Sequence, residues 1–174
     1  MYRKVFAGVV TVIVAVWVLG HAAAAEWETD YARAVSNATK TGRYLLLDFS
    51  GSDWCGWCMK LEDEVFSKPA FKKFAREKLV CVLVDFPRAK HQSKKLQKQN
   101  AALAEKHGIR GYPTVVLLSP EEELVGRTGY QPDGPEKYVE HLRAMIEQYE
   151  QKHPRKPPEN PTAPAKMSVD TGCQ

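Results

Sequence analysis

The residues with the clearest capacity for chemistry are two cysteines, Cys55 and Cys58, in the segment SGSDWCGWCMKLEDEVF (50–66). They follow an apolar run and precede a pattern in which Cys58, Leu61 and Val65 share one helical face. Cys55 is therefore expected where a strand ends and a helix begins, with unpaired backbone N–H groups and the positive end of the helix dipole directed at its sulfur. Such surroundings lower a thiol pKa from about 8.5 to roughly 3.5–7.5, and this produces the nucleophilic thiolate.

Cys58 lies about one helical turn after Cys55, which brings the two sulfurs within bonding distance. We expect Cys55 to be the exposed, attacking thiol and Cys58 to be the more buried, resolving thiol. A mixed disulfide with a substrate would form on Cys55 and be released by attack of Cys58. The dithiol itself carries the two electrons of this exchange, so we expect no dissociable cofactor.

Two other interpretations of the cysteine pair are a zinc site and a static disulfide. Zinc requires two further ligands, and the remaining cysteines are Cys81, inside an apolar run, and Cys173, in a proline-rich tail. Four histidines lack the spacing of paired zinc ligands: His91, His107, His141 and His153. We therefore expect no metal site. A static disulfide stays open, although so short a loop constrains the unfolded chain little.

The N-terminus has the three-part pattern of a secretory signal peptide. Residues 1–4 carry two positive charges, residues 5–19 carry none, and Ala23 and Ala25 form an A-x-A cleavage site. We expect residues 1–25 to be a signal peptide, and the alternative is a retained membrane anchor. In either case the domain is exported, periplasmic or secreted, to a compartment where disulfides persist.

Composition and charge point to one ordinary globular domain. The chain has 174 residues, of which 44% are hydrophobic and 26% charged. Without Arg3 and Lys4 there are 23 basic and 21 acidic residues, a net charge of +2 that gives no reason to expect nucleic-acid binding. The basic cluster HQSKKLQK (91–98) is interpreted as the solvated start of a helix.

The apolar periodicities predict the element order α-β-α-α-β-α-β-β-α. Helices are expected over 29–41, in the cysteine segment, from 67 onward, over 94–107 and over 135–151. Strands are expected over 44–49, 79–86, 114–119 and 124–129. Strands separated by helices are expected to run parallel, while the last two form an antiparallel hairpin whose final strand lies at a sheet edge.

This order predicts an α/β domain over residues 26–152, in which helices cover both faces of a central mixed sheet of about four strands. Residues 153–174 contain five prolines and show no helical or strand period. We expect this segment to be a disordered tail.

Two segments, LLLDFSGSDWCGWCMKLEDEVF (45–66) and GIRGYPTVVLLS (108–119), together resemble the thioredoxin superfamily. The similarity is to exported bacterial thioredoxin-like proteins in which an acidic or Asp-Trp pair precedes CxxC, and it covers about residues 27–149. It implies a three-layer α/β/α fold with disulfide exchange at the cysteine pair. It also implies that Pro113 is a cis-proline and that Tyr112 pairs with an extended substrate.

The resemblance implies a role for Asp48 as the buried acid that accepts a proton from the resolving cysteine. A carboxylate buried in an apolar strand has a raised pKa and serves as a general base near neutral pH. The segment from Asp48 to Cys55 is one residue longer than in the common family pattern, so a purely structural role for Asp48 stays open. Asp53 is a nearer acid that we expect to be exposed.

The dipeptide between the cysteines, Gly56-Trp57, contains no histidine to stabilise the thiolate, and the charge of Asp53 is expected to oppose thiolate formation. These features favour a reducing or isomerising role over that of a strong oxidant. Trp54, Gly56 and Trp57 are expected to face the substrate together with Tyr112 and Pro113, with packing as the alternative for Trp54.

We therefore expect an extracytoplasmic thiol–disulfide oxidoreductase, a reductase or isomerase that acts on cysteine-containing client proteins. Its dithiol must be restored by a redox partner, for which a membrane thiol reductase is expected, and the protein is expected to be a monomer. The alternative is a thioredoxin-fold protein-binding module with little redox turnover.

Overall fold

A computed structural model describes residues 27–154. The predicted signal segment and residues 155–174 of the predicted tail lie outside this range. The elements are α1 (Tyr31–Thr41), β1 (Tyr44–Ser50), α2 (Gly56–Leu61), the π-helix η1 (Glu62–Phe66), α3 (Pro69–Lys78), β2 (Leu79–Asp85), α4 (Lys94–Lys106), β3 (Thr114–Leu118), β4 (Leu124–Thr128) and α5 (Gly134–Lys152). Among residues 27–154, no helix is both long and apolar enough to span a bilayer.

The four strands form one mixed sheet in the order β2-β1-β3-β4. β1 and β2 are parallel, and β3 is antiparallel to both β1 and β4. The prediction that helix-separated strands run parallel is therefore wrong for β3. Asp85, the last residue of β2, pairs with Ser50, while Thr114, the first residue of β3, pairs with Phe49. The connection through α4 thus begins and ends at one end of the sheet, and the strand that follows must run back.

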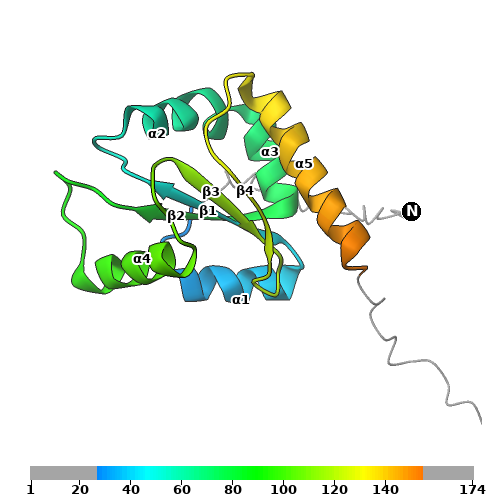
Figure 1. The fold of residues 1–174 in the computed structure, drawn as a ribbon, viewed down its shortest axis with the longest axis horizontal. Helices are drawn as coiled ribbons and strands as arrows, with labels where there is room; N and C mark the ends of the chain where they lie inside the picture. The colour runs from blue at the N-terminus through cyan, green and yellow to red at the C-terminus, as the bar shows by residue number, and fades with distance from the viewer. Residues whose placement is uncertain (1–26, 155–174) are drawn as a thin grey trace, which may run out of the picture.

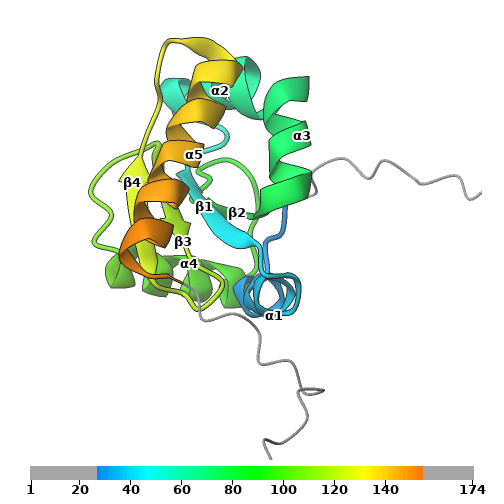
Figure 2. The same cartoon turned by 90° about the vertical axis from the view of Figure 1, so that its right-hand side faces the viewer.

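Helices cover both faces of the sheet, as predicted. Figure 1 shows α1 and α4 on one face and α2, α3 and α5 on the other, and Figure 2 shows the same layers from the side. All seven residues of β1 are buried, and they alternate between two apolar clusters, one on each face. Leu46 faces α3 and α5, whereas Leu45 and Leu47 face α1 and α4. Asp48, two residues after Leu46, consequently lies on the face that carries the cysteine helix.

Local capping accounts for where the helices begin and end. The Asp30 carboxylate accepts the N–H of Arg33 at 3.1 Å, so α1 starts one residue later than this cap. Gly42 ends α1 with a left-handed φ of 67°. Pro69 occupies the first turn of α3, where the missing N–H of proline costs no hydrogen bond. The π-helical turn η1, which continues α2, was not expected from the periodicity.

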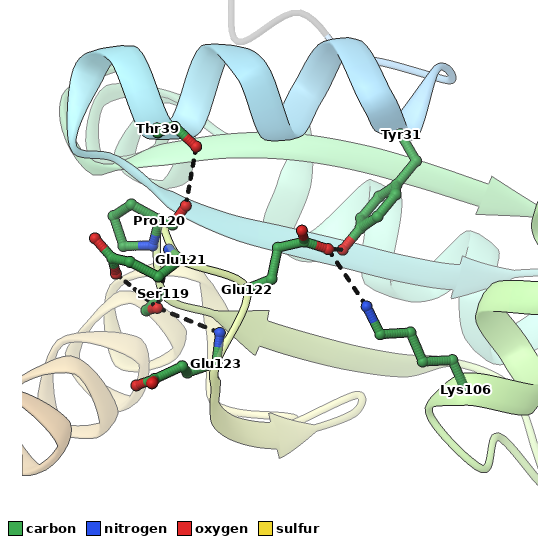
Figure 3. Close-up of polar contacts among 8 residues, drawn as sticks. All are labelled: Tyr31, Thr39, Lys106, Ser119, Pro120, Glu121, Glu122 and Glu123. Carbon is green, nitrogen blue, oxygen red and sulfur yellow. Dashed lines mark hydrogen bonds and ion pairs between the residues drawn. The ribbon is translucent and has the colours of Figure 1, made fainter.

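The turn between β3 and β4 lies at the end of the sheet opposite to the cysteines, and it is tied to three helices. Thr39 of α1 donates to Pro120 O at 3.2 Å, and Tyr31 donates to Glu122 at 2.5 Å (Figure 3). Lys106 at the end of α4 is 3.3 Å from the same Glu122 carboxylate, and α5 contributes a further tyrosine hydroxyl to the turn. This end of the molecule is therefore cross-linked by polar contacts, and the two cysteines lie at the opposite end.

Candidate active site

Cys55 and Cys58 form a disulfide at the start of α2, with their Cα atoms 5.2 Å apart. Cys55 is the N-cap residue, and its Sγ accepts the backbone N–H of Cys58 at 3.2 Å. The sulfur thus occupies the position at which a capping oxygen normally satisfies the first unpaired amides of a helix. When the disulfide is reduced, the same amide and the helix dipole favour the Cys55 thiolate over the thiol.

The expected difference in exposure between the two cysteines is absent from the disulfide form. Cys55 is 7% exposed and Cys58 is 5% exposed, so the prediction of an exposed Cys55 is wrong for this state. The reason lies in the turn that follows β1. The N–H groups of Trp54 and Cys55 donate to Gly51 O at 3.1 and 2.8 Å, which closes a tight turn directly before the sulfur.

Asp48 and Cys58 line the same open pocket, which has a volume of about 350 Å³. The Asp48 side chain is 7% exposed, and its Oδ1 finds no hydrogen-bond partner among residues 27–154. Burial raises the pKa of Asp48 to about 7, and the charges of Glu62 and Asp85 add to this effect. The additional residue between Asp48 and Cys55 therefore does not prevent Asp48 from sharing a pocket with the resolving cysteine.

Glu62 is a second acid in this pocket, and its role there was not predicted from the sequence. Partial desolvation raises the pKa of Glu62, and the Glu62 charge in turn raises the pKa of Asp48. A signal for Glu62 was present in the sequence, because it follows Cys58 by four residues and therefore shares one helical face with it. The pocket thus places the resolving cysteine beside Asp48 and Glu62, two carboxyl groups whose pKa values are both raised.

Trp54 is fixed in place on the side of the disulfide that faces β2. Its indole N–H donates to Phe86 O at 2.7 Å, and its ring meets the Tyr112 ring edge-on at a centroid distance of 5.7 Å. The guanidinium of Arg88 lies 3.9 Å from the Trp54 ring centroid. A Cβ added to Gly51 would lie 2.4 Å from Trp54, so this glycine allows the ring to approach the backbone. These contacts make Trp54 a packed residue that borders the cysteines.

Asp53 is engaged by the loop that follows β2. Its carboxylate accepts the backbone N–H groups of Arg88, Ala89 and Lys90 at distances between 2.7 and 3.2 Å. These hydrogen bonds lower the pKa of Asp53. The expectation of a simple exposed acid is therefore incomplete, because this carboxylate is the anchor of a loop.

Trp57 projects from the other side of the disulfide and is 59% exposed. Its ring contacts Tyr130 at a centroid distance of 5.2 Å, and the Lys60 ammonium lies 5.3 Å from the Trp57 ring and 5.1 Å from the Tyr130 ring. Met59 is also exposed, at 49%. This side therefore offers apolar surface to solvent beside the cysteines.

The remaining predicted site residues lie around the same end of the sheet. The Tyr112–Pro113 peptide bond is cis, as the resemblance implies. Tyr112 packs against both Trp54 and Phe86, which places the cis-proline loop beside the Trp54 side of the site. Gly56 is the first residue of α2, and a Cβ there would meet no atom within 4 Å, so the surface above it is open.

A disulfide-forming CxxC at the start of a helix, on a mixed sheet whose neighbouring strand follows a cis-proline, defines a thiol–disulfide oxidoreductase of the thioredoxin fold. Known proteins agree with this classification. The family of thioredoxin-like domains matches residues 31–146. The disulfide bond reductase DsbH of Chlamydia pneumoniae is 34% identical over 125 residues, which span 72% of this chain and 75% of DsbH.

A solved structure of a DsbH oxidoreductase has a TM-score of 0.69 and 33% identity, covering 72% of this chain and 86% of that one. The thioredoxin-related protein DsbJ of Chlamydia pneumoniae is 40% identical over 103 residues, which span 59% of this chain but only 30% of DsbJ. The chain therefore belongs to the thioredoxin-like family.

Proposed function

We propose that this protein is a disulfide reductase that acts on cysteine-containing client proteins outside the cytoplasm. The observation that carries the proposal is the placement of Cys55 Sγ as the cap of α2, with Cys58 and Asp48 in one pocket behind it. The reducing direction is supported by the name of DsbH, a disulfide bond reductase with 34% identity. An isomerase uses the same dithiol, so the two activities differ in the client and not in the first step.

The reaction begins with the dithiol form. The Cys55 thiolate attacks one sulfur of a client disulfide, and the other client sulfur leaves as a thiolate. Cys58 then loses its proton to the Asp48 carboxylate and attacks Cys55 Sγ. This second attack releases the first client sulfur as a thiolate and forms the Cys55–Cys58 disulfide. Two electrons have passed from the dithiol to the client, and the client thiolates take up protons from solvent.

The surrounding residues have separate roles in this proposal. Tyr112 and Pro113 shape the groove in which an extended client segment lies beside Cys55, and Trp57, exposed next to the open surface above Gly56, provides apolar contact for the client. Trp54, which is held by four neighbours, supports the wall of this groove rather than moving to meet the client.

Reduction of insulin in the presence of dithiothreitol tests the activity. We expect the wild-type protein to accelerate insulin precipitation and Cys55→Ser to abolish the acceleration. Cys81→Ser is the matched control, because Cys81 is a buried free cysteine and its replacement should leave the rate unchanged. If wild type and Cys55→Ser gave the same rate of insulin precipitation, the reductase proposal would be wrong and a thioredoxin-fold binding module would be favoured.

Equilibration of the Cys55–Cys58 pair with glutathione tests the direction of electron flow. A reduction potential near about −270 mV agrees with a reductase, and a value near about −120 mV would make the protein an oxidant. The variant Cys58→Ser should accumulate mixed disulfides on Cys55, because the resolving attack is lost. Mass spectrometry of these adducts identifies the clients and the redox partner, for which we propose a membrane thiol reductase.

The export of the protein is tested separately. We propose that residues 1–25 are removed, so that the mature chain starts at Glu26. Mass spectrometry of the N-terminal peptide of the protein recovered from the extracytoplasmic fraction checks this cleavage. Recovery of the uncleaved chain in the membrane fraction would instead show that the segment is retained as an anchor. A single species at the monomer mass in sedimentation is expected in either case.

A further inference from the structure

The segment from Arg88 to Lys98 contains several cationic side chains and no acidic one. No aspartate or glutamate occurs between Phe86 and Ala104. Five cationic side chains lie in this interval, and all five residues are exposed: Arg88, Lys90, Lys94, Lys95 and Lys98. We call these five residues the basic segment. Two of them precede α4, so the basic segment is more than the solvated start of a helix.

The side chains of the basic segment form no ion pair within the described part of the chain. Lys94 and Lys95 stand in the first turn of α4, which contains no acidic residue. Positive charge is unfavourable there, because the N-terminal end of a helix dipole is itself positive. The stability of α4 therefore does not explain these lysines.

Polar contacts fasten the start of the basic segment beside the active site. The carboxylate of Asp53, two residues before Cys55, accepts hydrogen bonds from the backbone N–H groups of residues 88–90. Lys90 Nζ donates to Ser52 Oγ at 3.1 Å. The Arg88 guanidinium covers the Trp54 ring. Figure 1 shows the loop between β2 and α4 at the same end of the molecule as the segment that leads into α2. The basic segment thus begins at one wall of the active site and continues along the chain into α4.

We propose that the basic segment is a docking surface for acidic stretches of the polypeptides whose disulfides the Cys55–Cys58 pair exchanges. The proposal rests on the proposed function and specifies its client class: proteins in which glutamate or aspartate residues accompany the reactive cysteine. A polypeptide fits better than a lipid surface, because the charge begins at the wall of the groove that an extended client occupies. Asp53 is the positioning residue that keeps this surface in register with the cysteines.

Two synthetic peptide disulfides test the proposal. They are identical except that three glutamates follow the cysteine in one and three glutamines in the other. We expect the reduced protein to react with the acidic peptide about tenfold faster at low ionic strength, because attraction raises association rates by a factor of ~10 or more. The advantage should vanish near about 0.5 M salt, where screening reduces the range of charge interactions to a few ångströms.

A matched pair of triple variants assigns the effect to the basic segment. K94Q/K95Q/K98Q removes three of its charges and leaves the contacts of Arg88 and Lys90 intact. K40Q/K73Q/K78Q removes the same net charge from exposed positions on α1 and α3. We expect the first variant to lose most of the preference for the acidic peptide and to react normally with the neutral peptide. The second variant should keep the preference.

Equal rates for the two peptides in the wild-type protein would overturn the docking proposal and leave the proposed function standing. An equal loss of preference in both triple variants would also overturn it, because net charge alone would then explain the effect. Failure to reduce either peptide would overturn the proposed function, and the docking proposal with it. Binding of the wild type, but not of K94Q/K95Q/K98Q, to vesicles containing about 30% anionic lipid, together with equal peptide rates, would assign the segment to a membrane surface instead.

Discussion

Two aspartates flank the disulfide, and their surroundings act on them in opposite ways. Asp48 is buried in a pocket shared with Cys58, its Oδ1 lacks a hydrogen-bond partner among residues 27–154, and its pKa rises to about 7. Asp53 lies at the surface, accepts hydrogen bonds from three successive amides and has a lowered pKa. The difference shows that Asp48 is suited to exchange a proton, whereas Asp53 is suited to hold a backbone segment as a permanent anion.

Trp54 and Trp57, the tryptophans on either side of the disulfide, also differ in their surroundings. Trp54, on the Asp53 side, is hydrogen-bonded and packed against its neighbours, whereas Trp57, beside the open face of α2, is 59% exposed. Each has a tyrosine ring and a cation next to it, so composition alone does not separate them. The Asp53 side of the disulfide is therefore held by packing and hydrogen bonds, and the Trp57 side is a surface that partners can reach.

Replacing Asp48 with Asn should have the largest effect. The folded protein keeps a proton on Asp48 up to about pH 7, whereas the unfolded chain releases it near pH 4, so the wild-type free energy of unfolding falls as the pH rises between these values. A shift from 3.8 to about 7 corresponds to as much as about 4 kcal/mol at about 1.36 kcal/mol per pH unit. D48N should recover this free energy above pH 7.

Denaturant unfolding of the disulfide form at pH 5 and pH 9 checks this expectation. The gain of D48N over wild type should be clearly larger at pH 9 than at pH 5. The control is D133N, at the exposed start of α5, where the aspartate side chain makes no capping hydrogen bond. An equal gain of D48N at both pH values would mean that Asp48 is not protonated in the folded protein.

Replacing Trp54 or Trp57 with alanine should lower the free energy of unfolding by clearly different amounts. We expect Trp54→Ala to lower the free energy of unfolding by about 3 kcal/mol, since it removes a packed ring and leaves Phe86 O without its donor. Trp57→Ala should cost less than about 1 kcal/mol, because most of that ring is in solvent. The midpoints of thermal unfolding measure both. Similar losses would show that the two sides are equally packed.

Replacing Asp53 with Asn should loosen the loop and alter the reactive thiol little, although the sequence suggested that the Asp53 charge opposes thiolate formation, because three loop amides bind this carboxylate. The amide oxygen of Asn carries no charge for the N–H groups of Arg88, Ala89 and Lys90, so trypsin should cleave after Arg88 and Lys90 several-fold faster. If Asp53 acted through its charge on Cys55, D53N would instead lower the pKa of the Cys55 thiol. The pH dependence of alkylation of the reduced protein distinguishes these outcomes, and D133N again serves as the control.

The smallest effect is expected at Cys81, which lies on the Asp48 face of the sheet. Burial raises the pKa of this thiol to about 12, so about one molecule in ten thousand is ionised at pH 8. We expect iodoacetamide to leave Cys81 unlabelled in the folded protein and to label it after unfolding. Peptide mass spectrometry reads out both conditions. Rapid labelling of the folded protein would show that this face opens more readily than its packing indicates.

Several features of this protein follow from local patterns in its sequence. The run over residues 44–49 and the helical spacing after Cys55 place the cysteines at a strand-to-helix junction, because a buried strand and an amphipathic helix each have a period of their own. The cis-proline at Pro113 followed from the resemblance to thioredoxins, and the structure confirms it. Such features depend on residues that are neighbours in the chain.

Other features depended on packing between distant segments, so only the tertiary structure decided them. The three amides that bind Asp53 lie at least 35 residues away in the chain, and no local pattern relates them to it. The direction of β3 was decided by the end of the sheet at which the α4 connection returns. The raised pKa of Asp48 was expected from its place in a buried strand, whereas the pocket shared with Cys58 and the contribution of Glu62 to that pKa were not, because they depend on what surrounds a group in space and not on its position in the sequence.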